Sequence, residues 1–395
     1  MDMPKLAPEI SGIVSQTIKN MPMSGIRGFD NKISTIPGIL KLTLGEPDFN
    51  VPDHIKEAAI QGIKDNDSHY AASNGKLELR QAIAKRLKES RGVDYDPNGE
   101  ILVTNGATEG LGDIMLGALN PGDEVLVPTP AFSLYFSVIR MAGAKVVQLD
   151  TFKNGFELTT DQLKKALDEH PNAKMILMNY PSNPTGRVYS KEKIKELAEL
   201  FKQHHILVVA DEIYSDLEYN QKHSSLASLI PGQVLLVSGV SKSFAMTGWR
   251  IGFIAGPAEL LAEITKVHSF LTIAVNDIAQ DAAIEAYEHG QDDPLKFKAA
   301  YEKRRDFIMG KLKEMGFEMA TPEGAFYIFA KIPAKFGKDD EKFALALAQK
   351  AKVGVVPGSA FGDGGQGYIR ISYAASDEKL AQAMAQIKEH LSELQ

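Results

Sequence analysis

The sequence predicts an α/β protein with a mostly parallel sheet in a large domain, joined to a smaller α+β domain. From Ile101 onward, short apolar runs alternate with helical patterns, which is typical of βαβ units and a parallel sheet. The chain has 395 residues, more than one ordinary core accommodates, so two domains are expected. Lys242 follows the apolar run Val234 to Val237, where an open α/β sheet holds its ligands.

Composition excludes several classes of function. The chain is 44% hydrophobic and 24% charged, with a net charge of −7, which argues against nucleic acid as a partner. Cysteine is absent, so disulfides, Cys-ligated metals and thiol catalysis are excluded, and no metal site is predicted. The first residues lack an apolar signal region, and no run of about 18 apolar residues occurs. We therefore expect a cytoplasmic protein without membrane contact.

The first predicted strand of the sheet, 101–104, ends in a tight turn at Asn105 to Gly110. This turn, which contains Gly106, Ala107 and Thr108, leads into a helix that runs through Leu119. Free backbone N–H groups at this helix start, with Gly106 permitting close approach, make an anion site. A glycine-rich strand-to-helix turn is common, so an ordinary turn remains an alternative.

Two further strands, 124–128 and 174–179, end in proline-rich segments. Phe132 follows the first and is either a core residue or part of a ligand site. Asn183 follows the second in a loop fixed by two prolines and a glycine, so its side chain has a set direction. Its amide can donate a hydrogen bond to a phenolate oxygen, or the residue can form an Asx turn.

The run 206–210 delivers Asp211 directly after five apolar residues. A carboxylate in that position needs a cationic partner, such as a protonated pyridine nitrogen. Tyr214, three residues on, can reach the opposite edge of the same ring. The alternative for Asp211 is a helix N-cap.

Lys242 lies in a predicted loop after the next strand, with Ser238, Ser241 and Arg250 as donors suited to a phosphate. Burial should lower the pKa of the lysine and make its amine nucleophilic. A nucleophilic amine beside a phosphate cradle describes a pyridoxal-phosphate (PLP) site. The alternative is a solvated loop lysine.

The remaining candidates lie outside this strand series. Helices are predicted from Pro52 and after Gly75, and again from Pro257 to about residue 315; strands are predicted over 324–329, 353–358 and 368–372. Gly45 allows close backbone approach or a positive φ, and Tyr70 alone suggests a packed aromatic residue. Arg370, between two isoleucines on a strand, needs a carboxylate, from either a structural Asp or a ligand.

The segment Ser-Lys-Ser-Phe-Ala-Met-Thr-Gly-Trp-Arg-Ile-Gly, residues 241–252, resembles the lysine motif of the class I/II aminotransferases, which are fold-type-I PLP enzymes. The similarity continues from about Leu42 to the C-terminus. The resemblance implies a large domain with a seven-stranded, mostly parallel sheet between helices. It places an irregular N-terminal arm with part of the small domain at 1–45, the large PLP-binding domain at 46–285, and the small domain at 286–395.

The resemblance also implies roles for the candidate residues. Phe132 would stack on the pyridine ring, Asn183 and Tyr214 would donate to its phenolate oxygen, and Asp211 would pair with its nitrogen. Gly45, Asn183 and Arg370 would contact the substrate, Arg370 by forking onto the α-carboxylate. Tyr70 would reach the phosphate of the neighbouring subunit's cofactor, which implies a homodimer with shared sites.

The implied activity is ping-pong transamination between an L-amino acid and a 2-oxo acid. The segment Ser24 to Arg27, with Ile26 as a substrate-site candidate, and the segment Pro-Ala-Phe-Ser-Leu-Tyr resemble bacterial aromatic aminotransferases. Aromatic substrates are therefore predicted. A C–S β-lyase or a synthase would use the same PLP residues. A non-catalytic effector-binding domain is the other alternative, against which residues 1–40 show no basic helix-turn-helix pattern.

Overall fold

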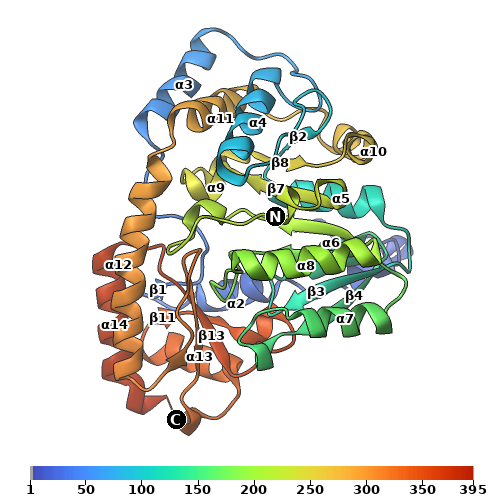
Figure 1. Cartoon of the computed structure of the whole chain (residues 1–395). Coiled ribbons are helices and arrows are strands. Elements are labelled where there is room, and N and C mark those ends of the chain that lie inside the picture. The colour runs from blue at the N-terminus through green and yellow to red at the C-terminus, as the bar shows by residue number, and fades with distance from the viewer. Residues whose placement is uncertain (1–2, 395) are drawn as a thin grey trace.

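The computed structural model describes residues 3–394, which form two lobes (Figure 1). The larger lobe contains a seven-stranded sheet in the order β2-β8-β7-β6-β5-β3-β4. All neighbouring strands are parallel except at β8, which is antiparallel to both β2 and β7. The predicted fold class is confirmed. The strands are β2 (Ile101–Thr104), β3 (Glu124–Thr129), β4 (Lys145–Asp150), β5 (Ala173–Asn179), β6 (Leu207–Asp211), β7 (Val234–Gly239) and β8 (Gly252–Ala255).

Helices cover both faces of this sheet, which is why its central strands are apolar without alternation. In β7, Leu236 packs in one helical layer while Leu235 and Val237 pack in the other. The first layer contains α3 (Asp53–Lys64), α4 (Leu77–Arg91), α7 (Thr160–Glu169), α8 (Lys191–His204) and α11 (Asp277–His289). The second contains α5 (Ala107–Ala118), α6 (Leu134–Met141) and α10 (Ala258–Leu271).

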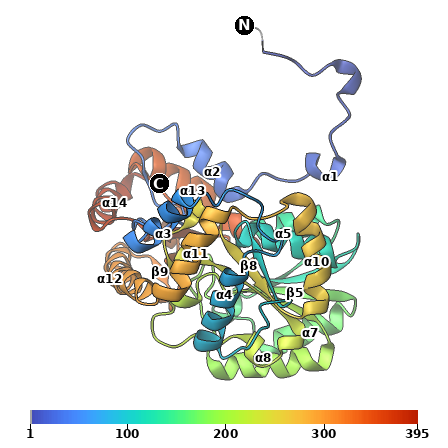
Figure 2. The ribbon, with the colours of Figure 1, turned by 90° about the horizontal axis from the view of Figure 1, so that it is seen from above.

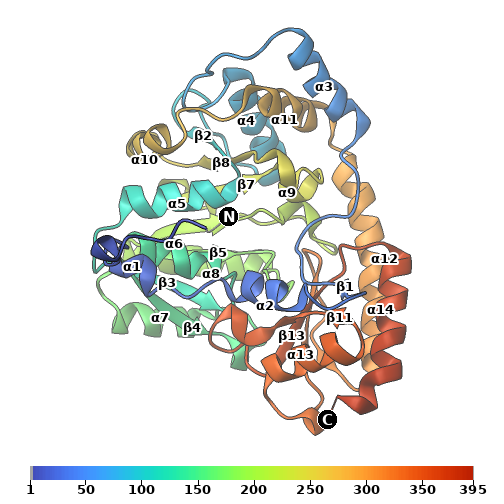
Figure 3. The same cartoon turned by 180° about the vertical axis from the view of Figure 1, so that it is seen from behind.

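The smaller lobe has its own core around an antiparallel sheet in the order β12-β13-β10-β9. A separate parallel pair joins β1 to β11, so an early segment of the chain is built into this lobe (Figure 3). The long helix α12 runs between the two lobes. The strands are β1 (Leu40–Lys41), β9 (Glu318–Met319), β10 (Tyr327–Lys331), β11 (Val353–Gly354), β12 (Val356–Pro357) and β13 (Tyr368–Ser372); the helices are α2 (Gly25–Ile33), α12 (Asp293–Glu314), α13 (Asp340–Lys350) and α14 (Asp377–His390).

Three local predictions were wrong. The N-terminal segment is not wholly irregular, since it contains α1 (Gln16–Lys19) and α2, whose Phe29 and Ile33 pack in the small-lobe core. The residues before α1 extend away from the body of the protein (Figure 2). The strand predicted over 324–329 begins only at Tyr327, because Ala325 has a φ of +57°. Lys242 lies in a short helix, α9 (Val240–Ser243), and not in a loop.

Short 3-10 helices connect several elements. They span Pro8–Ile10, Phe152–Asn154, Ser215–Leu217, Leu226–Ser228, Pro231–Gln233, Thr247–Trp249, Ala334–Phe336, Gly358–Phe361 and Leu391–Glu393.

None of the helices within residues 3–394 combines the length and apolar character that crossing a bilayer requires.

Candidate active site

The candidate residues of the large lobe gather at one edge of the sheet. Parallel strands end side by side, and the register pairs Asn179 with Asp211 and Asp211 with Val237. The structure therefore brings Asp211 close to the loop of Asn183 and to the helix of Lys242. The small lobe completes this edge, because Arg370 on β13 donates from Nη1 to Asn183 Oδ1 at 2.8 Å.

Lys242 projects from α9 toward the segment that links the two lobes. Its Nζ donates to the backbone oxygen of Gly45 at 2.7 Å. Burial lowers the pKa of Lys242 to about 8, and the positive charges of Arg250 and Arg370 act in the same direction. A substantial fraction of the amine is therefore neutral near pH 8, as a nucleophile requires. The alternative of a solvated lysine is wrong.

Gly45 owes its place to close packing, since its φ is not in the left-handed region. A Cβ built at Gly45 would collide with the hydroxyl of Tyr327. The same tyrosine forms a hydroxyl–hydroxyl hydrogen bond of 2.8 Å with Tyr214, which is buried. Burial raises the pKa of Tyr214, so its hydroxyl stays protonated and can donate.

The start of α5 forms a cradle with Arg250. Gly106 has a φ of +79°, and a Cβ there would collide with the Arg250 guanidinium. The backbone of Arg250 is also in the left-handed region, with a φ of +58°. Its Nη1 donates to the backbone oxygen of Thr247 at 2.8 Å. The first amides of α5, at Ala107 and Thr108, have no partner within the helix because a helix leaves its first N–H groups free. A guanidinium over a free helix start is an anion site.

The two serines of the predicted cradle are both buried, at the end of β7 and in α9. Ser238 donates to the backbone oxygen of Glu212 at 3.4 Å. Ser241 lies next to Lys242, so both hydroxyls lie at the same strand end as the lysine.

Asp211 is buried, and hydrogen-bonded on both oxygens. Tyr135 donates its hydroxyl to Oδ2 at 2.7 Å, and the amide of Ile213 donates to Oδ1 at 3.1 Å. Burial raises the pKa of Asp211 to about 6. Within residues 3–394 no cationic side chain forms an ion pair with this carboxylate. The expected cation is therefore not supplied by the described chain, and no α-helix begins here for Asp211 to cap.

Tyr135 is the contact that sequence reasoning missed. It lies on α6, three residues after Phe132, and the two rings meet edge to face with centroids 5.7 Å apart. Phe132 itself is half-buried between the large-lobe core and a small aromatic cluster. The available signal was the close spacing of two aromatic residues after a strand end.

Arg370 is buried, and its environment is polar on one side and aromatic on the other. Besides Asn183, it donates from Nη2 to the backbone oxygen of Thr43. Its guanidinium carbon lies 4.4 Å from the ring centroid of Tyr327 and 5.0 Å from that of Phe361. No carboxylate of residues 3–394 pairs with it, so the structural-Asp alternative is wrong, and Nε has no hydrogen-bond partner in the described chain.

Two candidates lie at the periphery. Tyr70 is 83% exposed, so it is not a packed aromatic residue of the single chain. It lines a hollow together with the segment 274–278. Ile26, on α2, is buried against Phe329, Val356 and Phe361.

Comparison with known proteins identifies the family. The model of the family "Aminotransferase class I and II" matches residues 37–387. The chain belongs to the class I and II aminotransferases. The probable N-acetyl-LL-diaminopimelate aminotransferase of Bacillus subtilis is 39% identical over 376 residues, covering 95% of each chain. The aromatic-amino-acid aminotransferase 2 of Thermococcus litoralis is 36% identical over 389 residues, covering 96% of this chain and 98% of its own.

A solved structure supports the same conclusion. The aspartate aminotransferase from Thermus thermophilus with maleate superimposes with a TM-score of 0.90 at 34% identity, covering 95% of this chain and 99% of its own. This aminotransferase is thus an enzyme that uses PLP and acts on amino acids and 2-oxo acids. The names of its relatives differ in substrate, so family membership does not fix the amino acid.

Proposed function

We propose that this aminotransferase transfers the amino group of an aromatic L-amino acid to a 2-oxo acid by a ping-pong mechanism, with Lys242 holding PLP. One observation supports this proposal above others. Among residues 3–394, Asp211 is a buried carboxylate that no cationic side chain pairs with, and Arg370 is a buried cation that no carboxylate pairs with. Buried charges need partners. A pyridinium and a substrate carboxylate are partners of the required signs.

The residues present fit PLP. Gly106 lets the Arg250 guanidinium lie against the start of α5, where a Cβ would collide with it, and the free amides of Ala107 and Thr108 suit a phosphate. Ser238 and Ser241 add hydroxyl donors at the same strand end. PLP, when bound, supplies an electron sink for the carbanion formed at the substrate's Cα. Phe132, half-buried at this edge, provides a ring face for stacking.

Lys242 and Asp211 perform the chemistry in this proposal. Lys242 would hold the cofactor through Nζ, and its lowered pKa suits the neutral amine to taking a proton from the substrate's Cα. Asp211, oriented by Tyr135 and by the Ile213 amide, keeps a proton on the ring nitrogen. A fixed carboxylate stabilises that charge without reorganisation during the reaction.

Asn183, Tyr214 and Arg370 position the reactants. Asn183 accepts from Arg370 through Oδ1, which leaves its amide NH2 for the phenolate oxygen. Tyr214 stays protonated and offers a second donor there. Arg370 presents a planar fork that suits an α-carboxylate bidentately, and Gly45 lets the backbone approach the same group.

The surroundings of Arg370 support an aromatic substrate. Ile26, Phe329 and Phe361 form a small apolar cluster, against which Phe132, Phe156 and Tyr368 pack. Arg187 lines the cavity that includes Asn183 and Phe156, but it is paired with Glu157 at 3.0 Å and Glu323 at 3.3 Å. A cation already paired twice is a poor partner for a substrate's second carboxylate.

A homodimer with shared sites is part of this proposal. Tyr70 is exposed beside an apolar stretch in which Phe270 is 87% exposed, Leu271 64% and Ile273 54%. Contiguous apolar exposure of this kind marks an interaction surface. We propose that a second copy of the chain covers this apolar surface, and that Tyr70 reaches the phosphate of the cofactor bound by that second copy.

Absorbance titration of the PLP form tests the substrate class. Aromatic amino acids should convert the cofactor at lower concentration than aspartate or alanine, and a 2-oxo acid should restore the starting spectrum. Tighter half-saturation by aspartate would overturn the aromatic assignment. Pyruvate and ammonia formed from cystathionine without any 2-oxo acid would identify a C–S lyase instead.

A further inference from the structure

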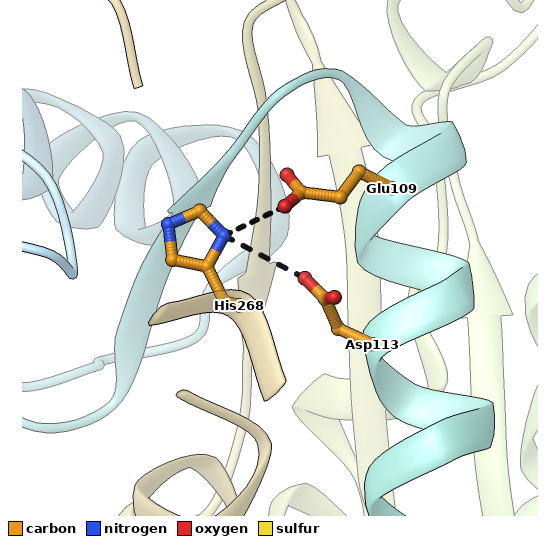
Figure 4. Close-up of side chains that lie close together, drawn as sticks. All are labelled: Glu109, Asp113 and His268. Carbon is orange, nitrogen blue, oxygen red and sulfur yellow. Dashed lines mark hydrogen bonds and ion pairs between the residues drawn. The ribbon is translucent and has the colours of Figure 1, made fainter. Parts of the chain in front are cut away.

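A buried group of three polar side chains lies on the α5–α10 side of the sheet, outside the proposed catalytic residues. Glu109 and Asp113 extend from α5, and His268 extends from α10 to meet them (Figure 4). His268 Nδ1 lies 2.9 Å from Glu109 Oε1 and 3.7 Å from Asp113 Oδ2. The side chains of His268 and Asp113 are fully buried, and that of Glu109 is 15% exposed.

Asp113 is the unexplained member. Both of its carboxylate oxygens are buried without a hydrogen-bond partner among the described residues. Glu109, by contrast, also accepts from the hydroxyl of Thr272 and from the backbone amide of Asn105. Burying a carboxylate without hydrogen-bond partners costs free energy. Asp113 points at Nδ1 of His268, the same nitrogen that Glu109 contacts.

Two other histidines of this chain also contact two carboxylates each, one through each ring nitrogen. His54 meets Glu285 through Nδ1 at 2.8 Å and Asp293 through Nε2 at 2.9 Å. His223 likewise contacts its two carboxylates through different nitrogens. At His54 each ring nitrogen therefore has its own hydrogen-bond partner. At His268 both carboxylates face Nδ1, and one N–H cannot serve both well.

A metal ion requires donor atoms that can surround one point, and these three residues offer such a set. One donor atom from each of the three residues lies within 4.8 Å of the others, which holds for no other such group in residues 3–394. Tetrahedral ligands at zinc distances lie about 3.4 Å apart. The spacings of 2.9 and 3.7 Å bracket that value.

Charge supports the same conclusion. Two carboxylates with a protonated imidazole leave one excess negative charge in a buried place. A divalent cation with a neutral imidazole leaves none, which removes the cost of an uncompensated buried charge. One nitrogen and two carboxylate donors suit zinc-class ions.

We propose that Glu109, Asp113 and His268 form a structural site for a divalent transition-metal ion of the Zn²⁺ class. The ion would tie α10 to the first turns of α5, next to Gly106. This departs from the expectation, based on composition, that the chain has no metal site. Since no group in the described part of the chain accepts from His268 Nε2 to orient the ring, the affinity should be weaker than at a fully supported site, by about tenfold or more.

Zinc titration of the full-length, PLP-loaded protein tests this site. Protein freed of metal by a chelator is dialysed into phosphate-free buffer, and bound Zn²⁺ is counted per chain at rising free Zn²⁺. Wild type should bind one ion per chain at micromolar free Zn²⁺ and gain thermal stability. Asp113→Asn, which keeps the side chain's shape, and His268→Gln should weaken binding about tenfold or more.

His54→Gln is the matched control, since it also removes a histidine held by two carboxylates. It should bind Zn²⁺ as wild type does. Substitution with Co²⁺ gives a second readout, because a tetrahedral Co²⁺ spectrum should appear in wild type and be absent in Asp113→Asn. Circular dichroism checks that each variant is folded; if His268→Gln does not fold, Asp113→Asn decides. No Zn²⁺ binding below millimolar concentration, or equal binding by wild type and Asp113→Asn, would overturn the proposal.

Discussion

Replacing Arg370 by lysine should weaken binding of every substrate that carries an α-carboxylate. An ammonium keeps the charge but cannot form two parallel N–H···O bonds, and it cannot keep the contacts to Asn183 and Thr43 together. One charge-assisted hydrogen bond contributes about 1.5–3 kcal/mol, so its loss should raise the dissociation constant roughly 10- to 150-fold. The effect should fall on amino acids and 2-oxo acids alike.

The assay is absorbance titration of the PLP form with L-phenylalanine and with phenethylamine, which lacks the carboxylate. Arg370→Lys should shift the first titration by the predicted factor and leave the second nearly unchanged. Arg187→Lys is the matched control, because Arg187 lines the adjoining cavity yet is already paired with two glutamates. An equal loss for both ligands would show that Arg370 has a structural role, and the carboxylate assignment would be refuted.

Four further predictions concern the chemistry, the stability and the assembly. Lys242→Ala should abolish turnover while the folded protein keeps some PLP non-covalently; in wild type, borohydride reduction and peptide mapping should label Lys242, and a label on another lysine contradicts its role. Asp211→Asn should retain PLP but lower kcat more than about tenfold, a barrier change of about 1.4 kcal/mol. Because the folded pKa of Asp211 is about 6, against an ordinary 3.8, the folded apoprotein holds an extra proton between these values. Its unfolding free energy should therefore fall as pH rises from about 4 to 6, and denaturation of apo Asp211→Asn at each pH should lack that contribution. Mixing Lys242→Ala chains with Tyr70→Ala chains should restore activity, to at most about half per heterodimer, since one of its two sites is intact. Failure to recover activity despite demonstrated subunit exchange would exclude a shared site.

The sequence predicted best what depends on strand ends. Gly106, Asn183, Asp211 and Lys242 each follow an apolar run, and a parallel sheet places such positions at one edge whatever the loops do. The arrangement of the large lobe was therefore accessible from hydrophobic pattern and turn residues. The seven-stranded count came from the family resemblance and not from the pattern.

Contacts between separate elements could not be predicted from the sequence in the same way. Nothing local links Tyr135 on α6 to Asp211 on β6, or Tyr214 to Tyr327, because these pairs depend on how helices and lobes pack. The late start of β10 depends on one left-handed residue, Ala325, which is a residue type that rarely adopts that conformation.

The sequence contains a signal for the buried cluster on α5 and α10, but the composition had led to the expectation of no metal site. Glu109 and Asp113 are four residues apart on one helix, so they share a face. His268 continues the apolar stripe of Leu261 and Ile264 at helical spacing. The three polar residues thus fall where core residues belong, but only the packing of the two helices shows that they meet.

The two unpaired charges of the site are kept apart by the groups that hold them. Asp211 is anchored in the large lobe by Tyr135 and Ile213, and Arg370 is anchored by Asn183 and Thr43, so neither neutralises the other. Holding opposite charges unpaired in a buried place costs stability. A ligand that pairs with both charges would offset that cost. A ligand that satisfies both must carry a cation at one end and a carboxylate at the other. In the proposed site the PLP ring nitrogen would supply the cation for Asp211 and the substrate's α-carboxylate would supply the anion for Arg370.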